Sequence, residues 1–189
     1  MPNYINIIIS LLFLCLISPL LILISIIILI SSGLPIFYLQ DRIGYKNKKF
    51  KLIKFRTMKK DNSEHTTKNI TFVGRFLRKY SLDELPNFIN VLKGEMNIVG
   101  PRPLLLEYMN LYTPEQSKRH EVKPGITGLA QINGRNKIDW NEKFKFDIEY
   151  VKNRSLFLDL KIIFNTFKVI LITKNNDFDE ITISKKFKG

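Results

Sequence analysis

Two adjacent carboxylates, Asp83 and Glu84, interrupt a chain that is otherwise strongly basic. The 189 residues carry 30 Lys and Arg against 17 Asp and Glu, a formal net charge of +13 at pH 7. Neighbouring carboxylates can hold a hard divalent cation together with substrate phosphates, and an aspartate can form a covalent phosphoryl intermediate. The pair therefore predicts phosphoryl transfer, in which positioning and charge neutralisation supply most of the catalysis.

The same pair has a purely structural interpretation. Ser81 and Glu84 have the spacing of a capping box, in which Ser81 would cap the start of a helix. Pro86 would then stand at the fifth helical position, where its ring clashes with the preceding turn, whereas proline favours the first turn. We therefore expect Asp83 and Glu84 at an exposed bend between two helices, with the cap as the alternative.

Basic residues on either side of this pair are candidates for binding phosphate groups. Arg102 and Arg135 each lie in a turn rich in proline, asparagine or glycine, and a guanidinium presents a planar fork of donors to phosphate oxygens. We expect at least one of these two to bind phosphate, with a solvated charged surface as the alternative. The full set of candidates is Lys54, Arg56, Arg78, Arg102 and Arg135.

Other kinds of site have little support. The two histidines, His65 and His120, stand in polar segments with no carboxylate or cysteine at ligand spacing, so we expect both at the surface. The chain has neither G-x-G-x-x-G nor G-x-x-x-x-G-K-[ST], the glycine-rich motifs of nucleotide sites. It has no recognised nucleic-acid motif, and we expect no nucleic-acid partner. The charge of +13 still leaves one alternative to an enzyme, a membrane-tethered basic module that binds nucleic acid or anionic lipid without catalysis.

The first 40 residues contain no charged side chain and predict a membrane segment. Residues 5–30 are almost entirely apolar, and as a helix these 26 residues would be about 39 Å long, against about 30 Å for the hydrocarbon core. A cleaved signal peptide fits poorly, because a basic leader and a cleavage site are missing. Basic residues begin at Arg42, which places the soluble part on the cytoplasmic side.

The dipeptide Ser18-Pro19 divides this segment near its middle. A proline inside a helix removes one backbone hydrogen bond and pushes its ring against the preceding turn, so we expect a kink. Each half would be about 21 Å long, too short to cross a bilayer alone. The residues leave two topologies open, a single kinked span and a re-entrant hairpin that returns to the cytoplasmic face.

Hydrophobic periodicity and turn residues predict an α+β fold for the rest of the chain, mostly helical with a small sheet. Helices are expected over residues 72–80, 86–92, 114–121, 139–150 and 156–173, and a strand over residues 50–58. In the last helix we expect an apolar stripe to face the core, formed by Leu160, Ile163, Phe164, Phe167, Ile170 and Leu171. A position of this helix at the bilayer surface is the alternative.

Four segments carry a more specific pattern. They are KFRTM (residues 54–58), SLDELPNFINVLKGEMNIVGPRP (81–103), YTPEQSKRHEVKPGITGLAQINGRN (112–136) and WNEKFKFDIEYVKN (140–153). In order and spacing they resemble the bacterial sugar transferases of the small monotopic phosphoglycosyl transferase type. Several long motifs in register are far more specific than any single one, and the resemblance extends over nearly the whole chain.

This resemblance implies an enzyme that moves a sugar 1-phosphate from a UDP-sugar to undecaprenyl phosphate and releases UMP, in the first membrane step of glycan assembly. Asp83 would be the nucleophile of a Mg²⁺-dependent reaction with a covalent phosphosugar intermediate, and Glu84 would serve metal binding and geometry. By the same correspondence the phosphate or nucleotide contacts would be Lys54, Arg78, Arg102 and Arg135. Asp147 matches a further acidic position without an assigned role. We expect the sugar to be an N-acetylated amino sugar, such as diacetylbacillosamine. Galactose, glucose and N-acetylglucosamine are the alternatives.

The resemblance also implies a place at the bacterial inner membrane, with the catalytic domain facing the cytoplasm. In that family the Ser-Pro dipeptide, here Ser18 and Pro19, breaks a re-entrant helix whose two ends stay cytoplasmic, and amphipathic helices lie at the membrane surface. The chain then divides into a membrane segment over 1–34, a cytoplasmic catalytic domain over 35–175 and a polar tail over 176–189. The oligomeric state stays open.

Overall fold

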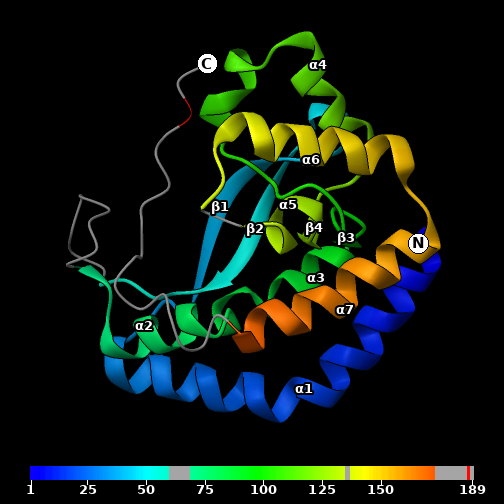
Figure 1. Cartoon of the computed structure of the whole chain (residues 1–189). Helices are drawn as coiled ribbons and strands as arrows, with labels where there is room; N and C mark the ends of the chain where they lie inside the picture. Colours follow the sequence, from blue (N-terminus) through cyan, green and yellow to red (C-terminus); the bar gives the residue numbers. More distant parts are fainter. Residues whose placement is uncertain (60–68, 135–136, 173–186, 188–189) are drawn as a thin grey trace.

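A computed structural model describes residues 1–59, 69–134, 137–172 and 187 of the chain. In chain order its elements are α1 (Asn3–Ser32), β1 (Phe37–Ile43), η1 (Tyr45–Asn47), β2 (Lys49–Phe55), α2 (Phe72–Lys79), η3 (Leu82–Glu84), α3 (Asn87–Leu92), β3 (Asn97–Val99), η4 (Leu106–Leu111), α4 (Pro114–Ser117), η5 (Lys118–Glu121), β4 (Gly125–Thr127), α5 (Leu129–Ile132), α6 (Trp140–Asn153) and α7 (Leu156–Ile172). Figure 1 shows α1 along one end of the molecule and α4 with α6 at the other. The fold is mostly helical with two small sheets, which confirms the predicted class.

α1 is a 30-residue helix with Pro19 inside it, and Figure 1 shows that it bends in its middle. Pro19 has no N–H to donate to the carbonyl of Cys15, its partner four residues back in a regular helix. Ser18 supplies the missing bond, because its hydroxyl donates to the Cys15 carbonyl at 2.9 Å. The serine thus satisfies the carbonyl that the proline leaves without a donor. α1 is also long and apolar enough to cross a membrane, with a mean hydropathy of 3.1.

Pro19 divides α1 into a first limb before it and a second limb after it, and both limbs pack against the same domain. In the first limb, the buried side chain of Asn6 accepts a hydrogen bond from the backbone N–H of Ile98 in β3, at 2.9 Å. In the second limb, Ile24 and Ile28 are buried in a cluster with Phe55 of β2. The start and the end of the apolar helix are therefore both fixed to one domain.

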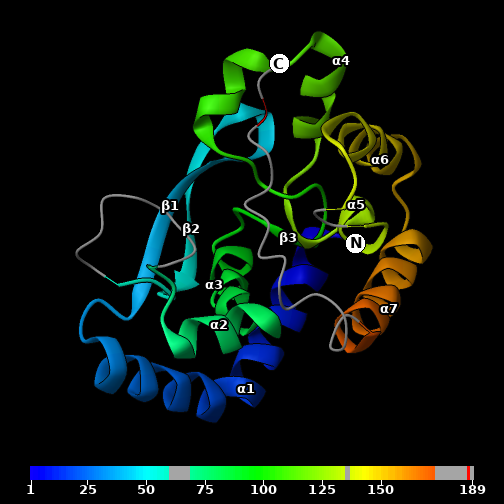
Figure 2. The ribbon, with the colours of Figure 1, turned by 60° about the vertical axis from the view of Figure 1, so that its left-hand side comes forward.

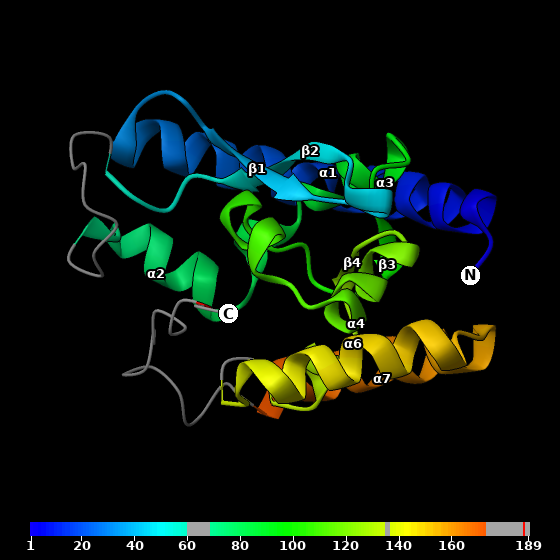
Figure 3. The same ribbon diagram turned by 90° about the horizontal axis from the view of Figure 1, so that it is seen from above.

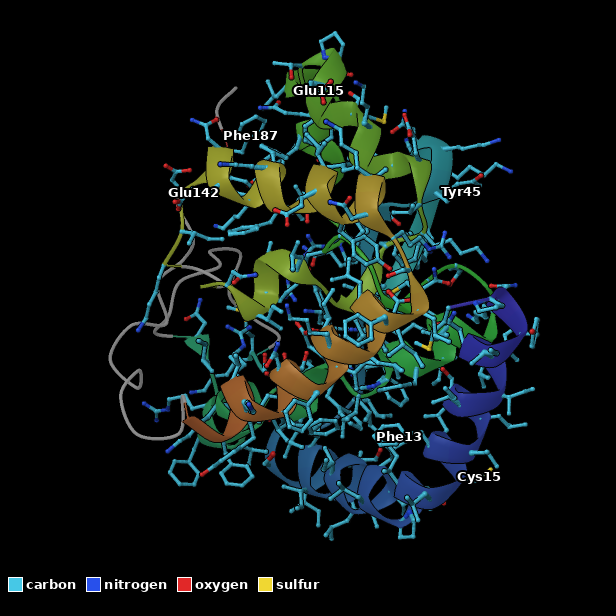
Figure 4. The ribbon with its side chains drawn as sticks, turned by 45° about the vertical axis from the view of Figure 1, so that its right-hand side comes forward. Phe13, Cys15, Tyr45, Glu115, Glu142 and Phe187 are labelled. Atoms are coloured by element: carbon cyan, nitrogen blue, oxygen red, sulfur yellow. The ribbon has the colours of Figure 1, made fainter. Side chains whose placement is uncertain are left out.

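One side of α1 is covered by protein and the other is bare. Figure 4 shows Phe13 pointing from α1 toward the body and Cys15 pointing away from it. The Phe13 ring lies 4.4 Å from the ring of Phe88 in α3, centroid to centroid, whereas Cys15 is exposed. Large apolar side chains such as Leu12 and Leu16 are exposed on the bare side. Water is a poor solvent for such a surface, which is typical of a lipid-facing helix.

Two two-stranded sheets connect the helices. β1 and β2 form an antiparallel ribbon in which Phe37 pairs with Phe55 and Ile43 with Lys49. The strand predicted over 50–58 is confirmed as β2, although it ends at Phe55, while β1 had no counterpart among the expected elements. The second sheet is a parallel pair, β3 and β4, with Val99 opposite Thr127.

The main core lies between β2, α3, β3, α6 and α7, where Val91, Met96, Val99, Tyr150 and Ile162 are fully buried. The helices predicted over 72–80, 86–92, 139–150 and 156–173 are confirmed within one to three residues, the last ending at Ile172. The helix predicted over 114–121 is shorter than expected, because α4 ends at Ser117 and continues as the 3₁₀ helix η5. The core therefore rests on elements that the hydrophobic periodicity had largely identified.

The predicted core-facing stripe of α7 is confirmed only in part. Ile163 packs against the main core beside the completely buried Ile162, and Ile170 is half-buried, but Leu160, Phe164 and Phe167 are exposed. The side chain of Leu171 lies outside the described ones. α7 is apolar around much of its circumference, so its periodicity does not distinguish the side that meets the core from a side that meets lipid. Phe72 of α2 is likewise 81% exposed. Figures 1 and 2 place α1, α2 and the C-terminal part of α7 at the same end of the molecule.

Candidate active site

The acidic pair lies in η3, a single 3₁₀ turn between α2 and α3. The capping box does not form, because Ser81 has a left-handed backbone (φ 55°) and its side chain makes no capping hydrogen bond. Thr71, not Ser81, caps a helix here, and its hydroxyl accepts from the N–H of Gly74 at the start of α2. The bend is confirmed, but its expected exposure is wrong: Asp83 is only 8% exposed, since β2 packs against η3.

Glu84 is held by two cations from two other elements. Lys54, on β2, donates from Nζ to Oε1 at 2.6 Å. Arg102, in the turn after β3, donates from Nη2 to Oε1 at 2.6 Å and from Nη1 to Oε2 at 3.3 Å. Burial alone would raise the pKa of Glu84, but Arg102 and Lys54 together lower it well below its usual value. Glu84 is therefore ionised and clamped.

Asp83 has different surroundings, although it is the next residue. Among the described residues, none donates a hydrogen bond to its carboxylate. Burial and the negative charge of Glu84 raise the pKa of Asp83, against the opposing effect of nearby Lys54, Arg78 and Arg102. A desolvated carboxylate with unoccupied lone pairs is a better nucleophile than a hydrated or clamped one. The structure thus assigns different capacities to the two acids.

The remaining predicted site residues fall in different places. Arg78 lies close enough to Asp83 for each to act on the pKa of the other, and its Nε donates to Thr57 at 2.8 Å. Arg56 lies outside this group, because its guanidinium donates to backbone carbonyls at the end of α1, including that of Gly33 at 2.6 Å. Arg135 lies outside the described residues.

Asp147 does not line the pocket that contains Glu84. It is buried on α6 and forms an ion pair with Arg119 of η5, at 2.7 Å between Oδ2 and Nη2. His120, the neighbour of Arg119, is buried as well, so its predicted place at the surface is wrong. Its ring lies 5.4 Å from that of Tyr112. His65, the other histidine, lies outside the described residues.

Two residues that the sequence analysis did not identify line the pocket with Lys54, Glu84 and Arg102. Arg42 comes from β1, and burial together with the charge of Arg102 lowers its pKa to about 10. Asn87 begins α3, and its buried Oδ1 has no hydrogen-bond partner among the described residues. The spacing of Gln40 and Arg42 on one strand face was the signal that could have found Arg42.

The charges in and beside this pocket do not balance. Four cationic side chains act on Asp83 or Glu84, namely Arg42, Lys54, Arg78 and Arg102. An excess of positive charge attracts anions with several charges, such as a diphosphate. The oxygen donors of Asp83, Glu84 and Asn87 suit Mg²⁺, which takes one or two carboxylates together with substrate phosphates and needs no larger protein cage. Among the described residues, no group of three or more His, Cys, Asp or Glu could hold a metal ion.

Comparison with known proteins finds similar sequences over most of the chain. The model of the family described as bacterial sugar transferase matches residues 1–173. The chain is 48% identical, over 85% of its length and 82% of the other, to the "Uncharacterized sugar transferase EpsL" of Bacillus subtilis (strain 168). It is 37% identical to the "Exopolysaccharide production protein ExoY" of Rhizobium meliloti (strain 1021), over 86% and 82%. It is 44% identical to the "UDP-glucose:undecaprenyl-phosphate glucose-1-phosphate transferase" of Escherichia coli (strain K12), over 85% of this chain and 38% of that protein.

Proposed function

Because the chain belongs to the bacterial sugar transferase family, we propose that it transfers a sugar 1-phosphate from a UDP-sugar to undecaprenyl phosphate and releases UMP. The observation that carries the proposal is the contrast between two adjacent acids: Glu84 is clamped in the pocket, whereas the neighbouring Asp83 takes no hydrogen bond from the described residues. The printed name of the E. coli relative, which specifies UDP-glucose and undecaprenyl phosphate, supports this choice of substrates.

The proposed reaction has two displacement steps at one phosphorus. In the first, an oxygen of the Asp83 carboxylate attacks the phosphorus that bears the sugar, and the bond from that phosphorus to the UMP oxygen breaks. The electron pair of the broken bond leaves with UMP. In the second, a phosphate oxygen of undecaprenyl phosphate attacks the same phosphorus and releases Asp83 as a carboxylate. Each step breaks one phosphorus–oxygen bond and forms one, so no oxidant or further reactant is needed.

Lys54 and Arg102 would bind the diphosphate during both steps. An ammonium has three donors and a guanidinium five, and the bonds to Glu84 use one donor of Lys54 and two of Arg102. The remaining N–H groups can donate to the phosphate oxygens while Glu84 keeps both side chains in place. Arg102 is 47% exposed and can therefore meet a ligand that enters from solvent.

Mg²⁺ is part of the proposal. Asp83, Glu84 and Asn87 would hold it, together with phosphate oxygens of the substrate. When bound, the ion supplies positive charge that reduces the repulsion between an anionic nucleophile and an anionic diphosphate.

A re-entrant α1 at the bacterial inner membrane completes the proposal, with the catalytic domain facing the cytoplasm. Two observations support it: both limbs of α1 pack on the same domain, and Arg56 binds the carbonyls at its end. The exposed aromatic residues Phe72, Phe164 and Phe167 would then lie at the membrane surface. A straight span would separate the ends of α1 by the full thickness of the bilayer.

Site-directed labelling of single cysteines tests this topology. In a Cys15→Ser background, Tyr4→Cys reports the first end of α1 and Tyr45→Cys reports the catalytic domain, since both tyrosines are exposed. A membrane-impermeant maleimide should label both positions in inside-out vesicles and neither in intact spheroplasts. Labelling of Tyr4→Cys from the periplasmic side would contradict the re-entrant helix and favour a span.

The sugar and the pathway step are the finer parts of the proposal. We propose an N-acetylated amino sugar, with diacetylbacillosamine as one member, and a place in the first membrane step of glycan assembly. UMP release should be measured with undecaprenyl phosphate and a panel of UDP-sugars that includes UDP-glucose and UDP-galactose. Faster turnover of UDP-glucose than of every acetylated sugar would contradict the first choice and leave the reaction type intact.

An acceptor-free burst tests the reaction type itself. Without undecaprenyl phosphate, the enzyme should release one equivalent of UMP from its UDP-sugar and carry the sugar phosphate on the peptide that contains Asp83. Mass spectrometry locates the adduct. A requirement for both substrates before any UMP appears would count against the covalent step.

A further inference from the structure

The turn that carries Arg102 is held through three successive backbone carbonyls. Gly125 donates its N–H to the carbonyl of Pro101 at 3.0 Å, Arg119 donates Nη2 to the carbonyl of Arg102 at 2.7 Å, and Arg42 donates Nη1 to the carbonyl of Pro103 at 3.2 Å. Of the three residues whose carbonyls accept these bonds, Pro101 and Pro103 have no N–H of their own. Acceptor bonds are therefore the main way in which other elements can fix this turn.

The bond to the carbonyl of Arg102 holds the residue whose side chain would bind phosphate, and its donor, Arg119, is buried. Arg119 is 2% exposed and lies on the other side of the turn from Glu84. Its Nε also donates to Asp147 Oδ2 at 3.0 Å, while Nη2 lies 2.7 Å from the same oxygen. The ring of Phe144 covers the guanidinium at 5.6 Å from its centroid. A planar guanidinium that is fixed at Nε and Nη2 has no freedom left to turn away from Arg102.

We propose that Asp147 and Arg119 are positioning residues for Arg102: the buried pair holds the main chain of Arg102 so that its guanidinium reaches Glu84 and the substrate phosphate. This inference rests on the proposed function, because it assumes that Arg102 binds phosphate. Neither Asp147 nor Arg119 lines the pocket that contains Glu84. They act through the backbone of another residue.

Two other roles for the pair fit the contacts less well. As a proton donor or acceptor, Asp147 would need access to substrate, but its side chain is 4% exposed and bound to Arg119. As a simple charge pair, Asp147 would need one cationic partner, and a lysine would serve as well. The guanidinium instead binds two acceptors on two elements, α6 and the turn, through one rigid fork.

A double-mutant cycle tests the proposal. Arg119→Lys keeps the charge and removes the fork, so it should lower kcat/KM for the UDP-sugar, measured by UMP release with undecaprenyl phosphate present, about tenfold to a hundredfold, as expected for a misplaced binding group. In an Arg102→Ala background the same substitution should change kcat/KM less than about twofold, because its effect runs through Arg102. If the two effects multiply, Arg119 acts independently of Arg102 and the proposal is wrong.

Tyr150→Phe is the matched control for a structural effect. Tyr150 is buried on α6 with Asp147, and its hydroxyl donates to Asp159 at 2.7 Å and to the Val99 carbonyl at 3.2 Å, but it does not contact the turn. This variant should lower the unfolding temperature and leave KM for the UDP-sugar unchanged. A rise in its KM equal to that of Arg119→Lys would mean that general destabilisation explains both, and would overturn the assignment.

Hydrogen exchange separates this inference from the proposed function. In Arg119→Lys the amides of Gly125 and Ile43, which donate to the carbonyls of Pro101 and Leu104, should exchange faster than in the wild type, and in Tyr150→Phe they should not. If Arg119→Lys does not fold, Asp147→Asn should give the same pattern, since it weakens the hold on the guanidinium. A wild type that releases no UMP from any UDP-sugar would refute the function, while exchange would still decide the positioning. Unchanged exchange in both variants would refute the positioning.

Discussion

Two arginine–carboxylate pairs in this molecule share the same chemistry and have opposite surroundings. In the pocket pair, Glu84 binds Arg102, which is half exposed, and shares it with Lys54. In the buried pair, Asp147 binds Arg119, and neither side chain reaches solvent. Water and ligands can replace the partners of an exposed ion. The N–H groups of the pocket pair can therefore donate to a phosphate. The buried pair cannot, since a buried ion without its partner is strongly unfavourable.

The two pairs therefore have different roles at the turn that carries Arg102. The two pairs lie on opposite sides of the backbone of Arg102, one bound to its guanidinium and the other to its carbonyl. The exposed side can change partners during catalysis. The buried side keeps the backbone in one position while it does so. Accessibility, more than the type of residue, therefore decides which ion pair takes part in chemistry.

The largest effect is expected at Asp83, beside the pocket pair. Asp83→Asn removes the attacking oxygen's charge and should reduce UMP release more than about a thousandfold. It should leave the protein folded, because burial already raises the pKa of Asp83 and thus disfavours its charge. UMP release and the unfolding temperature of the detergent-solubilised protein measure the two. A fully active variant would remove the nucleophile from the pocket.

Stability should distinguish the two pairs next. Asp147→Asn leaves the buried Arg119 without a counterion and should lower the free energy of unfolding by about 3 kcal/mol. Glu84→Gln leaves Arg102, which is 47% exposed and can turn to solvent, and Lys54, which is 15% exposed, so it should lower the free energy of unfolding by less, about 1 to 2 kcal/mol. Chemical denaturation compares the two variants. Equal losses of unfolding free energy would contradict the distinction between a pair that takes part in the reaction and a pair that positions Arg102.

A third effect concerns pH on the buried side. Burial and the charge of Arg119 lower the pKa of His120 to about 3, so the unfolded chain, with a histidine pKa near 6.5, takes up a proton first as the pH falls. Stability from the neutral histidine is therefore lost as the pH drops below about 6.5. Between pH 6.5 and pH 5 the loss should be about 1.5 kcal/mol.

His120→Gln provides the comparison for this pH effect, because glutamine does not titrate. The unfolding temperature of the variant should fall less than that of the wild type between pH 6.5 and pH 5. Parallel curves for the two proteins would show that His120 is already charged or solvated in the folded state.

The smallest effect is expected at an exposed pair on the same side. Lys118 lies next to Arg119 and forms an ion pair with Glu115, three residues earlier, with both side chains about half exposed. Glu115→Gln should change neither the unfolding temperature nor UMP release measurably, because solvent screens such pairs. A clear loss of activity would show that charge at η5 matters wherever it lies, and not through the contact with Arg102.

The sequence identified the parts of the site that depend on local structure. Pro86 placed the acidic pair at a bend, and the prolines on either side of Arg102 marked a fixed turn. Lys54 followed from the alternation of its strand. These signals extend over a few residues, so the composition and spacing of one segment are enough to read them.

The remaining parts depend on contacts between distant segments. Arg42 and Asn87 reach the pocket only because β1 pairs with β2 in one register and α3 packs behind it. His120 is buried because η1, some 70 residues earlier, covers it. For Leu160 and Phe164 the reason is different, since an apolar side chain that faces lipid and one that faces the core give the same pattern.

The hydrogen bond between Asn6 and Ile98 has a consequence for biogenesis. The two residues are 92 positions apart, so the asparagine leaves the ribosome long before its partner exists. At roughly 5 to 20 residues per second, translation needs roughly 5 to 20 seconds to deliver that partner. During this interval the first limb holds an amide oxygen without its final donor inside or beside the bilayer. Insertion of the apolar helix and its final anchoring are therefore separate events, and anchoring waits until β3 has been synthesised.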